Sequence, residues 1–252
     1  MTNRSLIISL FFASSLAFGQ VERIEAEFRV YPVLKIETEG IFYQPQPNAE
    51  MLELRFRSGD RSAVSYDYVG PPVLQFYREN GLNEDGEMQY RTVGQVTLDK
   101  PEMLIFFTKA TKTGEEGMEF SLLALDDGPG GLPMDHVAFL NFTPAPFVCR
   151  FMDKDFDIPP GAQPPISVAK KLNEDIFIGL AVRNQNTHRV VLKNRWQFHK
   201  GNRHYILLLP PTREGSFRIR AYRVTEFVGE KQRFNADWTP PQSSTSFNAS
   251  RL

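Results

Sequence analysis

The chain has 252 residues, 41% of them apolar, with a formal net charge of −1 at pH 7 and a pI near 6.5. It lacks the basic excess of a nucleic-acid-binding protein, so we expect no nucleic-acid partner. Its single cysteine excludes an intrachain disulfide, so a buried apolar core must hold the fold together.

Residues 1–19 have the layout of a secretory signal peptide. Arg4 precedes an apolar run of about 13 residues, from Leu6 to Phe18, and the small residues Ala17 and Gly19 mark a cleavage site. This run is shorter than the roughly 20 residues that span a bilayer, although an uncleaved N-terminal anchor is the alternative interpretation. We therefore expect an exported, soluble protein, periplasmic or extracellular, whose mature chain has no membrane span.

Charge divides the mature chain into two halves. Residues 20–135 contain 11 basic and 21 acidic residues, whereas residues 136–226 contain 14 basic and 7 acidic residues. Such a split indicates two structural units, which either attract each other or bind different partners. The length of the chain also favours two cores over one. We predict an acidic N-terminal domain over 20–135 and a basic C-terminal domain over 136–228.

Apolar and polar side chains alternate along the chain with the period of a half-buried strand. Residues 52–58 alternate leucine and phenylalanine with charged side chains, and residues 216–224 repeat the pattern. Apolar runs at 103–107 and 205–209 indicate central strands, and only 166–175 could form a short helix. The expected fold is all-β, with roughly thirteen or fourteen strands in two tandem antiparallel β-sandwich-like domains.

The two halves are similar to each other at a distance of roughly 100 residues. Residues 98–127 can be aligned with residues 198–226, since both run from a lysine-containing turn through an apolar strand and a hairpin into an alternating strand. This distance matches the size of one small sandwich domain. The alternative is that unrelated hairpins resemble one another. From 229 to 252 the alternation ends and Ser, Asn, Pro and Gln accumulate, so we expect a disordered tail.

Two acidic stretches resemble metal-binding loops. The segment DDGPGG, at 126–131, lies between two apolar runs but lacks the lysine and the helix of a phosphate-binding loop. Its glycines suit a turn between strands, which its two aspartates would cap, with calcium as the alternative. In the run DKDFD, at 153–157, the following Ile158 and Pro164 stand where a calcium loop requires glycine and glutamate. We expect a connector and a hairpin, and no metal site.

Four histidines and one cysteine could carry chemistry. His199 and His204 can approach each other across a hairpin, but two histidines without further ligands are too few for zinc. We expect exposed turn histidines, and a buried structural thiol at Cys149, which shares a strand face with Phe147 and Phe151. The chain has no G-x-S-x-G motif. A pair of glycosidase carboxylates stays open, but the sequence singles out none, so no catalytic residue or cofactor is predicted.

A basic face with aromatic edges is expected where two strands adjoin. One is the alternating strand at 216–224, and the other is the run VLKNRWQF at 191–198. Such a face suits an acidic glycan or an acidic protein surface. The alternative is a solvated face, or a docking surface for the acidic half. The predicted binding residues are Lys193, Arg195, Trp196, Arg218, Arg220 and Tyr222.

Three segments carry a family resemblance: PPVLQFYRE (71–79), VGQVTLDKPEMLIFF (93–107) and LALDDGPGGLPMDHVAFLNFTPAPF (123–147). They resemble a family of uncharacterised exported bacterial β-sandwich proteins, in which a segment of the form LDD…P…(F/L)-x-N joins two β-rich halves. The resemblance extends over about 69–226. It implies the two-domain fold and a connector role for DDGPGG, and it implies no activity and no site residue.

We therefore expect an exported, non-catalytic binding or scaffolding protein of the envelope or the extracellular space. Its ligand would be a protein partner or an anionic glycan. The missing catalytic motifs and the opposite charges of the two halves favour this interpretation. The alternatives are a carbohydrate-active enzyme with a carboxylate site on its loops, and a surface protein that self-associates through edge strands. The sequence predicts no oligomeric state.

Overall fold

The computed structural model describes residues 22–110, 117–184, 187–213, 215–216 and 218–227. Within these residues, no helix is long and apolar enough to cross a membrane. The predicted signal peptide and the predicted disordered tail both lie outside the described residues.

Two four-stranded sheets enclose the first core. Sheet A has the strand order β4 (Tyr66–Gly70), β1 (Ile24–Pro32), β7 (Glu102–Lys109), β8 (Phe120–Asp126). Sheet B has the order β3 (Leu52–Glu53), β2 (Phe42–Tyr43), β5 (Val73–Leu82), β6 (Met88–Thr97). Every second residue of β1 enters the core, as its alternating sequence dictates. The strand β7 is buried on both faces, which explains its continuous apolar run.

Two further sheets enclose the second core. Sheet C has the order β12 (Gly161–Ala162), β9 (His136–Asn141), β16 (Asn202–Leu209), β17 (Arg220–Phe227), and β13 (Ile166–Ser167) also pairs with β9. Sheet D has the order β11 (Lys154–Ile158), β10 (Phe147–Phe151), β14 (Asp175–Asn184), β15 (Thr187–Gln197). Phe139 of sheet C meets Phe151 of sheet D edge to face, with ring centroids 5.5 Å apart.

The two sandwiches share one topology. The strands β1, β7 and β8 occupy in sheet A the places that β9, β16 and β17 occupy in sheet C. In both sheets the first of these strands is parallel to the second, and the third is antiparallel to it. The all-β, sandwich-like fold predicted from the sequence is confirmed. The parallel pairs β1–β7 and β9–β16 are its departure from purely antiparallel pairing.

Two details differ from the sequence prediction. The described residues form seventeen strands rather than thirteen or fourteen, since β2, β3, β12 and β13 have two residues each and are too short to show a period. The expected short helix at 166–175 is limited to a 3-10 turn at Ala169–Lys171. The domain limits at 20–135 and 136–228 stay a prediction.

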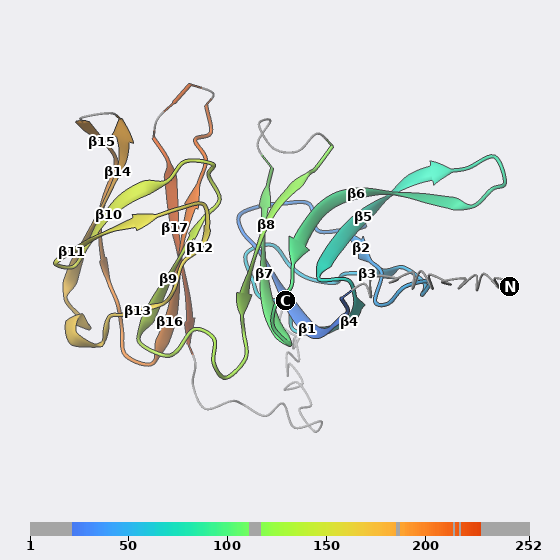
Figure 1. Cartoon of the computed structure of the whole chain (residues 1–252), viewed down its shortest axis with the longest axis horizontal. Helices are drawn as coiled ribbons and strands as arrows, with labels where there is room; N and C mark the ends of the chain where they lie inside the picture. The colour runs from blue at the N-terminus through green and yellow to red at the C-terminus, as the bar shows by residue number, and fades with distance from the viewer. Residues whose placement is uncertain (1–21, 111–116, 185–186, 214, 217, 228–252) are drawn as a thin grey trace, which may run out of the picture.

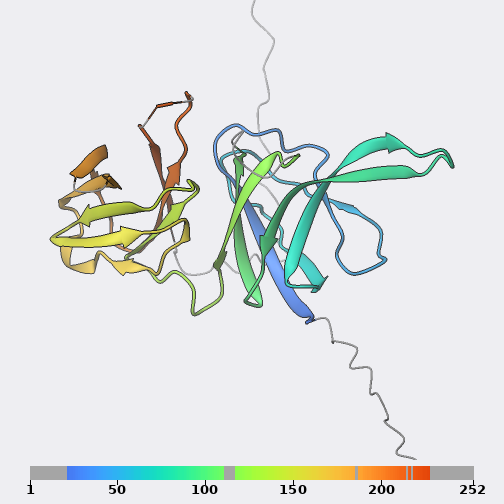
Figure 2. The same ribbon diagram turned by 45° about the horizontal axis from the view of Figure 1, so that its top comes forward.

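Sheets A and C pack against each other through their outer faces, so the four sheets lie in the order B, A, C, D (Figures 1 and 2). Phe106 of β7 and Tyr205 of β16 meet there, with ring centroids 5.0 Å apart. An apolar cluster fills the interface, and its fully or largely buried members are Val33, Leu104, Phe106, Leu132, Ala138, Leu140, Phe142, Tyr205, Leu207 and Leu209.

A charged cluster closes one end of this interface. Arg61, in the loop between β3 and β4, forms ion pairs with Asp127, just after β8, and with Glu226 of β17. Arg203 of β16 adds a longer contact to Asp127, with 3.8 Å between its Nη1 and the carboxylate. We call these four residues the Arg61 cluster. At the opposite end, where β7 and β16 finish, the two sandwiches leave a groove between them.

Candidate functional site

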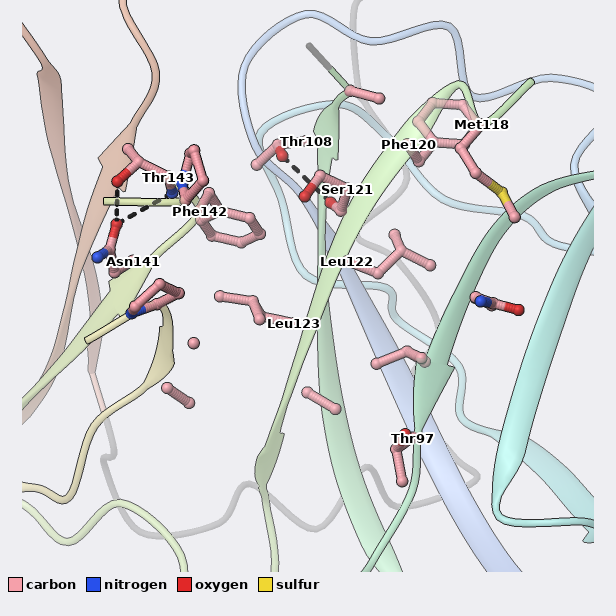
Figure 3. A pocket seen from close by; sticks show the side chains of 18 of the residues that line it. Thr97, Thr108, Met118, Phe120, Ser121, Leu122, Leu123, Asn141, Phe142 and Thr143 are labelled. Atoms are coloured by element: carbon pink, nitrogen blue, oxygen red, sulfur yellow. Dashed lines mark hydrogen bonds between the residues drawn. The ribbon is translucent and has the colours of Figure 1, made fainter. Parts of the chain in front are cut away.

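A groove of about 670 Å³ lies between the two sandwiches (Figure 3). The strand β8 runs through its middle, β6 forms the wall on one side, and β12 with the segment after β9 forms the other wall. Leu122 of β8 points toward β6, whereas Leu123 points toward Phe142 of the second sandwich (Figure 3). The alternation of β8 therefore makes the walls on both of its sides apolar.

Two neutral polar side chains of the groove, Asn141 and Thr143, are bound to each other and to the backbone. The Nδ2 of Asn141 donates to the Ala145 carbonyl at 2.8 Å, and its Oδ1 accepts bonds from the N–H and hydroxyl of Thr143 at 3.0 and 2.8 Å. Among the described residues that line the groove, Lys109 is the only charged one. These lining residues therefore supply no carboxylate and no histidine for acid–base chemistry, and apart from Lys109 the groove presents apolar and neutral polar groups.

The free edge of β8 faces this groove. The N–H of Asp127 donates to the carbonyl of Glu102 at 2.9 Å, so Asp127 and every second residue before it bond to β7. Leu122 and Ala124 lie between those positions, and in an antiparallel ladder they direct their N–H and C=O groups away from β7. The groove therefore offers backbone donors and acceptors as well as apolar walls.

The predicted basic face is divided between two surfaces. Lys193 and Arg195 of β15 are exposed on the outer face of sheet D. Trp196 alternates with them and packs toward the second core, so it is turned away from that surface. Among the described residues neither Lys193 nor Arg195 has an ion-pair partner.

The other predicted residues lie at β17, on the side of sheet C that faces the first sandwich. Tyr222 packs into the interface cluster, and Arg220 Nε donates to the Pro210 carbonyl at 3.1 Å. Arg218 precedes the strand and is exposed. The separation arises because β15 and β17 are edge strands of different sheets, which the alternation of each strand cannot reveal. A binding role for these residues stays a prediction.

The segment DDGPGG is a connector between β8 and β9. Asp126 Oδ1 accepts a bond from the N–H of Gly128 at 2.9 Å, which caps the turn as expected. Asp127 is held by Arg61. A Cβ on Gly131 would clash with the Asp126 carbonyl oxygen. The backbone at 131 lies so close to the backbone at 126 that only glycine fits there.

The aspartate run at 153–157 spans the turn and strand of the β10–β11 hairpin. Both oxygens of Asp155 accept bonds from Arg150 at 2.7 Å, and Asp157 lies 3.4 Å from Arg183. These carboxylates are exposed and paired with cations. Among the described residues, no group of three or more His, Cys, Asp or Glu side chains is placed to hold a metal ion.

The histidine prediction is wrong for His204. Its side chain is buried, with 1% exposed, against the ring of Phe198, whereas an exposed turn histidine was expected. Its Nδ1 lies 3.1 Å from Thr225 Oγ1, while His199 Nδ1 lies 2.8 Å from Asn173 Oδ1, so the two rings have separate partners. His204 is the first buried residue of β16, and it precedes the apolar run YILLL. The sequence prediction began the buried part of the strand at that run, so it placed His204 in a turn.

Cys149 is buried in the second core, as predicted. Burial, with a smaller contribution from Asp155, raises the pKa of its thiol to about 12. A thiol with this pKa carries almost no thiolate at neutral pH. Its role is therefore to fill space in the core.

No family model matches the chain, and no curated protein matches it significantly. The resemblance to exported bacterial β-sandwich proteins thus stays a prediction. Sequence reasoning missed the groove because its walls come from segments that are far apart in the chain. One signal was present: the run FSLLALD of β8 has no lysine, arginine or proline, which is unusual for a strand at a sheet edge.

Proposed function

We propose that the chain is an exported, non-catalytic binding protein, and that it binds a segment of a protein partner in the groove between the two sandwiches. The groove itself carries the proposal, since it joins apolar walls to backbone hydrogen-bonding groups in one concave surface. Export still rests on the signal peptide read from residues 1–19.

The lining of the groove favours binding over catalysis. Its hydroxyl groups belong to Thr97, Thr108, Ser121 and Thr143, and the described lining contains no histidine, aspartate or glutamate that could activate them. A glycosidase would need two carboxyl groups facing each other across the groove, at roughly 5–10 Å. Neither wall supplies one. The carbohydrate-active alternative therefore gains no support from this site.

Selection from random peptides tests the proposal. The purified chain from Gln20 onward would be panned against a phage-displayed library of dodecapeptides, and enriched peptides would be synthesised and titrated. Thr97 is exposed on the β6 wall of the groove, so Thr97→Arg should block the groove without disturbing the core. Val190→Arg, at a residue 53% exposed on sheet D, is the matched control.

Enriched peptides should bind wild type and Val190→Arg alike and should lose at least tenfold in affinity for Thr97→Arg. If no peptide is enriched, or if the enriched peptides bind all three proteins equally, the groove is not a peptide-binding site.

A second candidate ligand, an anionic glycan, is favoured by the outer face of sheet D. There Phe177 pairs with Arg195 on the neighbouring strand and Gly179 pairs with Lys193. A Cβ on Gly179 would stand 2.9 Å from the Phe177 ring, so the ring lies across the glycine and leaves a flat aromatic surface between the cations. Flat aromatic surfaces flanked by cations suit sulfated or carboxylated sugars.

A further inference from the structure

We infer that β8 is an acceptor strand: an extended segment of the partner adds to its free edge as an extra strand of sheet A. This inference rests on the proposed function and specifies how the groove would bind its ligand. Strand addition takes most of its affinity from main-chain hydrogen bonds and its specificity from pockets for alternate side chains.

The edge of β8 lacks the features that normally prevent strand addition. Natural sheets protect their edges with charges, prolines, bulges or very short strands. The strand β8 has seven residues, FSLLALD, with its one charge at the end, and it pairs with β7 without a register shift.

The other sheet edges in the described part of the chain are protected. The strand β17, which holds the place of β8 in the second sandwich, carries Arg220, Arg223 and Glu226. The strands β15 and β11 are rich in charge, and the β14–β15 and β5–β6 pairs contain register shifts. The remaining edges, β3, β4, β12 and β13, have two to five residues. Within one repeated architecture, β8 alone keeps a long apolar edge.

The hydrogen-bonding groups on this edge are placed for a short strand. Near the start of β8, the Val93 carbonyl of β6 already accepts a bond from the Glu119 N–H at 2.9 Å. Beyond that point, Phe120, Leu122 and Ala124 direct their N–H and C=O groups into the groove. A partner of about five residues would span these positions at 3.3 Å per residue.

The groove selects a single extended segment rather than a second folded copy. The walls of β6 and β12 flank the edge of β8 on both sides, so a strand that is part of another sheet would collide with them. Along this edge the only charged residue of the described lining is Lys109, which lies opposite Phe120 at the start of β8. The chemistry therefore fits a neutral polypeptide segment, with apolar side chains alternating toward Val96 and toward Phe142, and with an acidic group tolerated only at the Lys109 end.

A matched pair of substitutions at Ala124 tests the main-chain bonds. Since its N–H points away from β7, Ala124→Pro removes a groove donor and leaves the β7 ladder intact, whereas Ala124→Val keeps the donor and adds bulk. The probe is a peptide enriched on the wild-type chain. Ala124→Pro should weaken its binding by about tenfold, and Ala124→Val should weaken it less.

Backbone N-methylation along the same peptide gives an independent readout. Methylation at alternate residues should abolish binding, because only every second N–H faces β8, while the residues between should tolerate it. If Ala124→Pro does not fold, amide exchange in the wild-type chain replaces it: Leu122 and Ala124 should exchange fast when free and become protected on peptide binding.

The outcomes separate this inference from the proposal beneath it. A peptide that loses affinity for Thr97→Arg but shows neither the alternation nor new amide protection binds in the groove by side chains, and strand addition is then wrong. A peptide that is indifferent to Thr97→Arg overturns the groove as well.

Discussion

Asp127 and Glu226 hold corresponding positions at the ends of β8 and β17, and both carboxylates bind the guanidinium of Arg61. The Glu226 oxygen lies 3.2 Å from Arg61 Nη1 and also accepts a bond from the Tyr205 hydroxyl at 3.1 Å. Equivalent residues of the two sandwiches thus meet at one cation. The Arg61 cluster joins the two sandwiches at the end of the interface opposite the groove.

Removing that cation should destabilise the protein. Arg61→Met would leave two largely buried carboxylates, 11% and 17% exposed, without their main partner. Unpairing a buried charge costs about 3–5 kcal/mol, and the residual exposure here reduces the expected loss of unfolding free energy to about 2 kcal/mol. Urea denaturation would measure it. Arg57→Met, at an exposed arginine of the same loop, should change little; an equal effect of both variants would contradict the role of the cluster.

Strand periodicity made the fold class predictable from the sequence. In the run 52–58, Leu54 and Phe56 pack on the first core, although the strand is limited to Leu52–Glu53 and Leu52 is exposed. In the run 216–224, Ile219 and Ala221 pack on the second core, and the strand begins at Arg220. The similarity of 98–127 to 198–226 corresponds to the hairpins β7–β8 and β16–β17, which occupy the same places in sheets A and C.

Periodicity could not reveal how strands from different segments combine. It places Lys193 and Arg220 on the polar sides of their strands, but the two strands belong to different sheets, and Arg220 faces the other sandwich. The outer faces of sheets A and C are buried by packing between the sandwiches, which local sequence does not encode. For the same reason the groove, whose walls come from distant segments, was not predictable.

The free energy of unfolding should decrease as the pH is lowered, because His204 is buried in its neutral form. Burial, and to a smaller extent the nearby Arg223, lowers the pKa of its imidazole to about 4, whereas the unfolded chain has the ordinary value near 6.5. The unfolded state then binds more protons between these two values, so stability is complete above about pH 6.5 and declines as the pH falls toward 4. The full loss is about 3 kcal/mol.

His204→Met provides the comparison for that decline. Methionine occurs at Met103, which faces the first core from the start of β7, so the side chain suits such a position. Urea unfolding at pH 7 and pH 5 should show a smaller difference for His204→Met than for wild type. An unchanged difference would assign the pH dependence to other groups.

Cys149 should not react with thiol reagents in the folded protein. Its side chain is fully buried, and burial raises the pKa of the thiol to about 12. Both conditions suppress attack by the thiolate. Incubation with iodoacetamide at pH 8, followed by mass measurement, should show no adduct in native buffer and one adduct in 6 M guanidinium. Rapid native labelling would mean that sheets C and D open readily at β10.

The glycan candidate predicts salt-sensitive retention on immobilised heparin. Lys193→Gln with Arg195→Gln should elute at a lower salt concentration than wild type, because screening and loss of charge weaken the same contacts. The control is Arg213→Gln with Arg218→Gln, which removes two exposed cations near the start of β17. An equal shift for both pairs would show that net charge, and not the outer face of sheet D, determines retention.

Gly131 and Gly130, adjacent in the connector, should respond differently to alanine. At Gly131 an added Cβ would clash with the carbonyl oxygen of Asp126, a backbone atom that cannot turn aside. At Gly130 the nearest atom to an added Cβ is Asp126 Oδ2, at 3.9 Å, an ordinary contact. We expect Gly131→Ala to lose about 1–3 kcal/mol of unfolding free energy, the usual cost of forced overpacking, and Gly130→Ala to remain near wild type in the same denaturation assay.

The connector joins β8, the proposed acceptor strand, to β9. Gly131→Ala should therefore also weaken a groove-bound peptide, and a variant that loses stability but keeps full peptide affinity would show that the connector does not position β8.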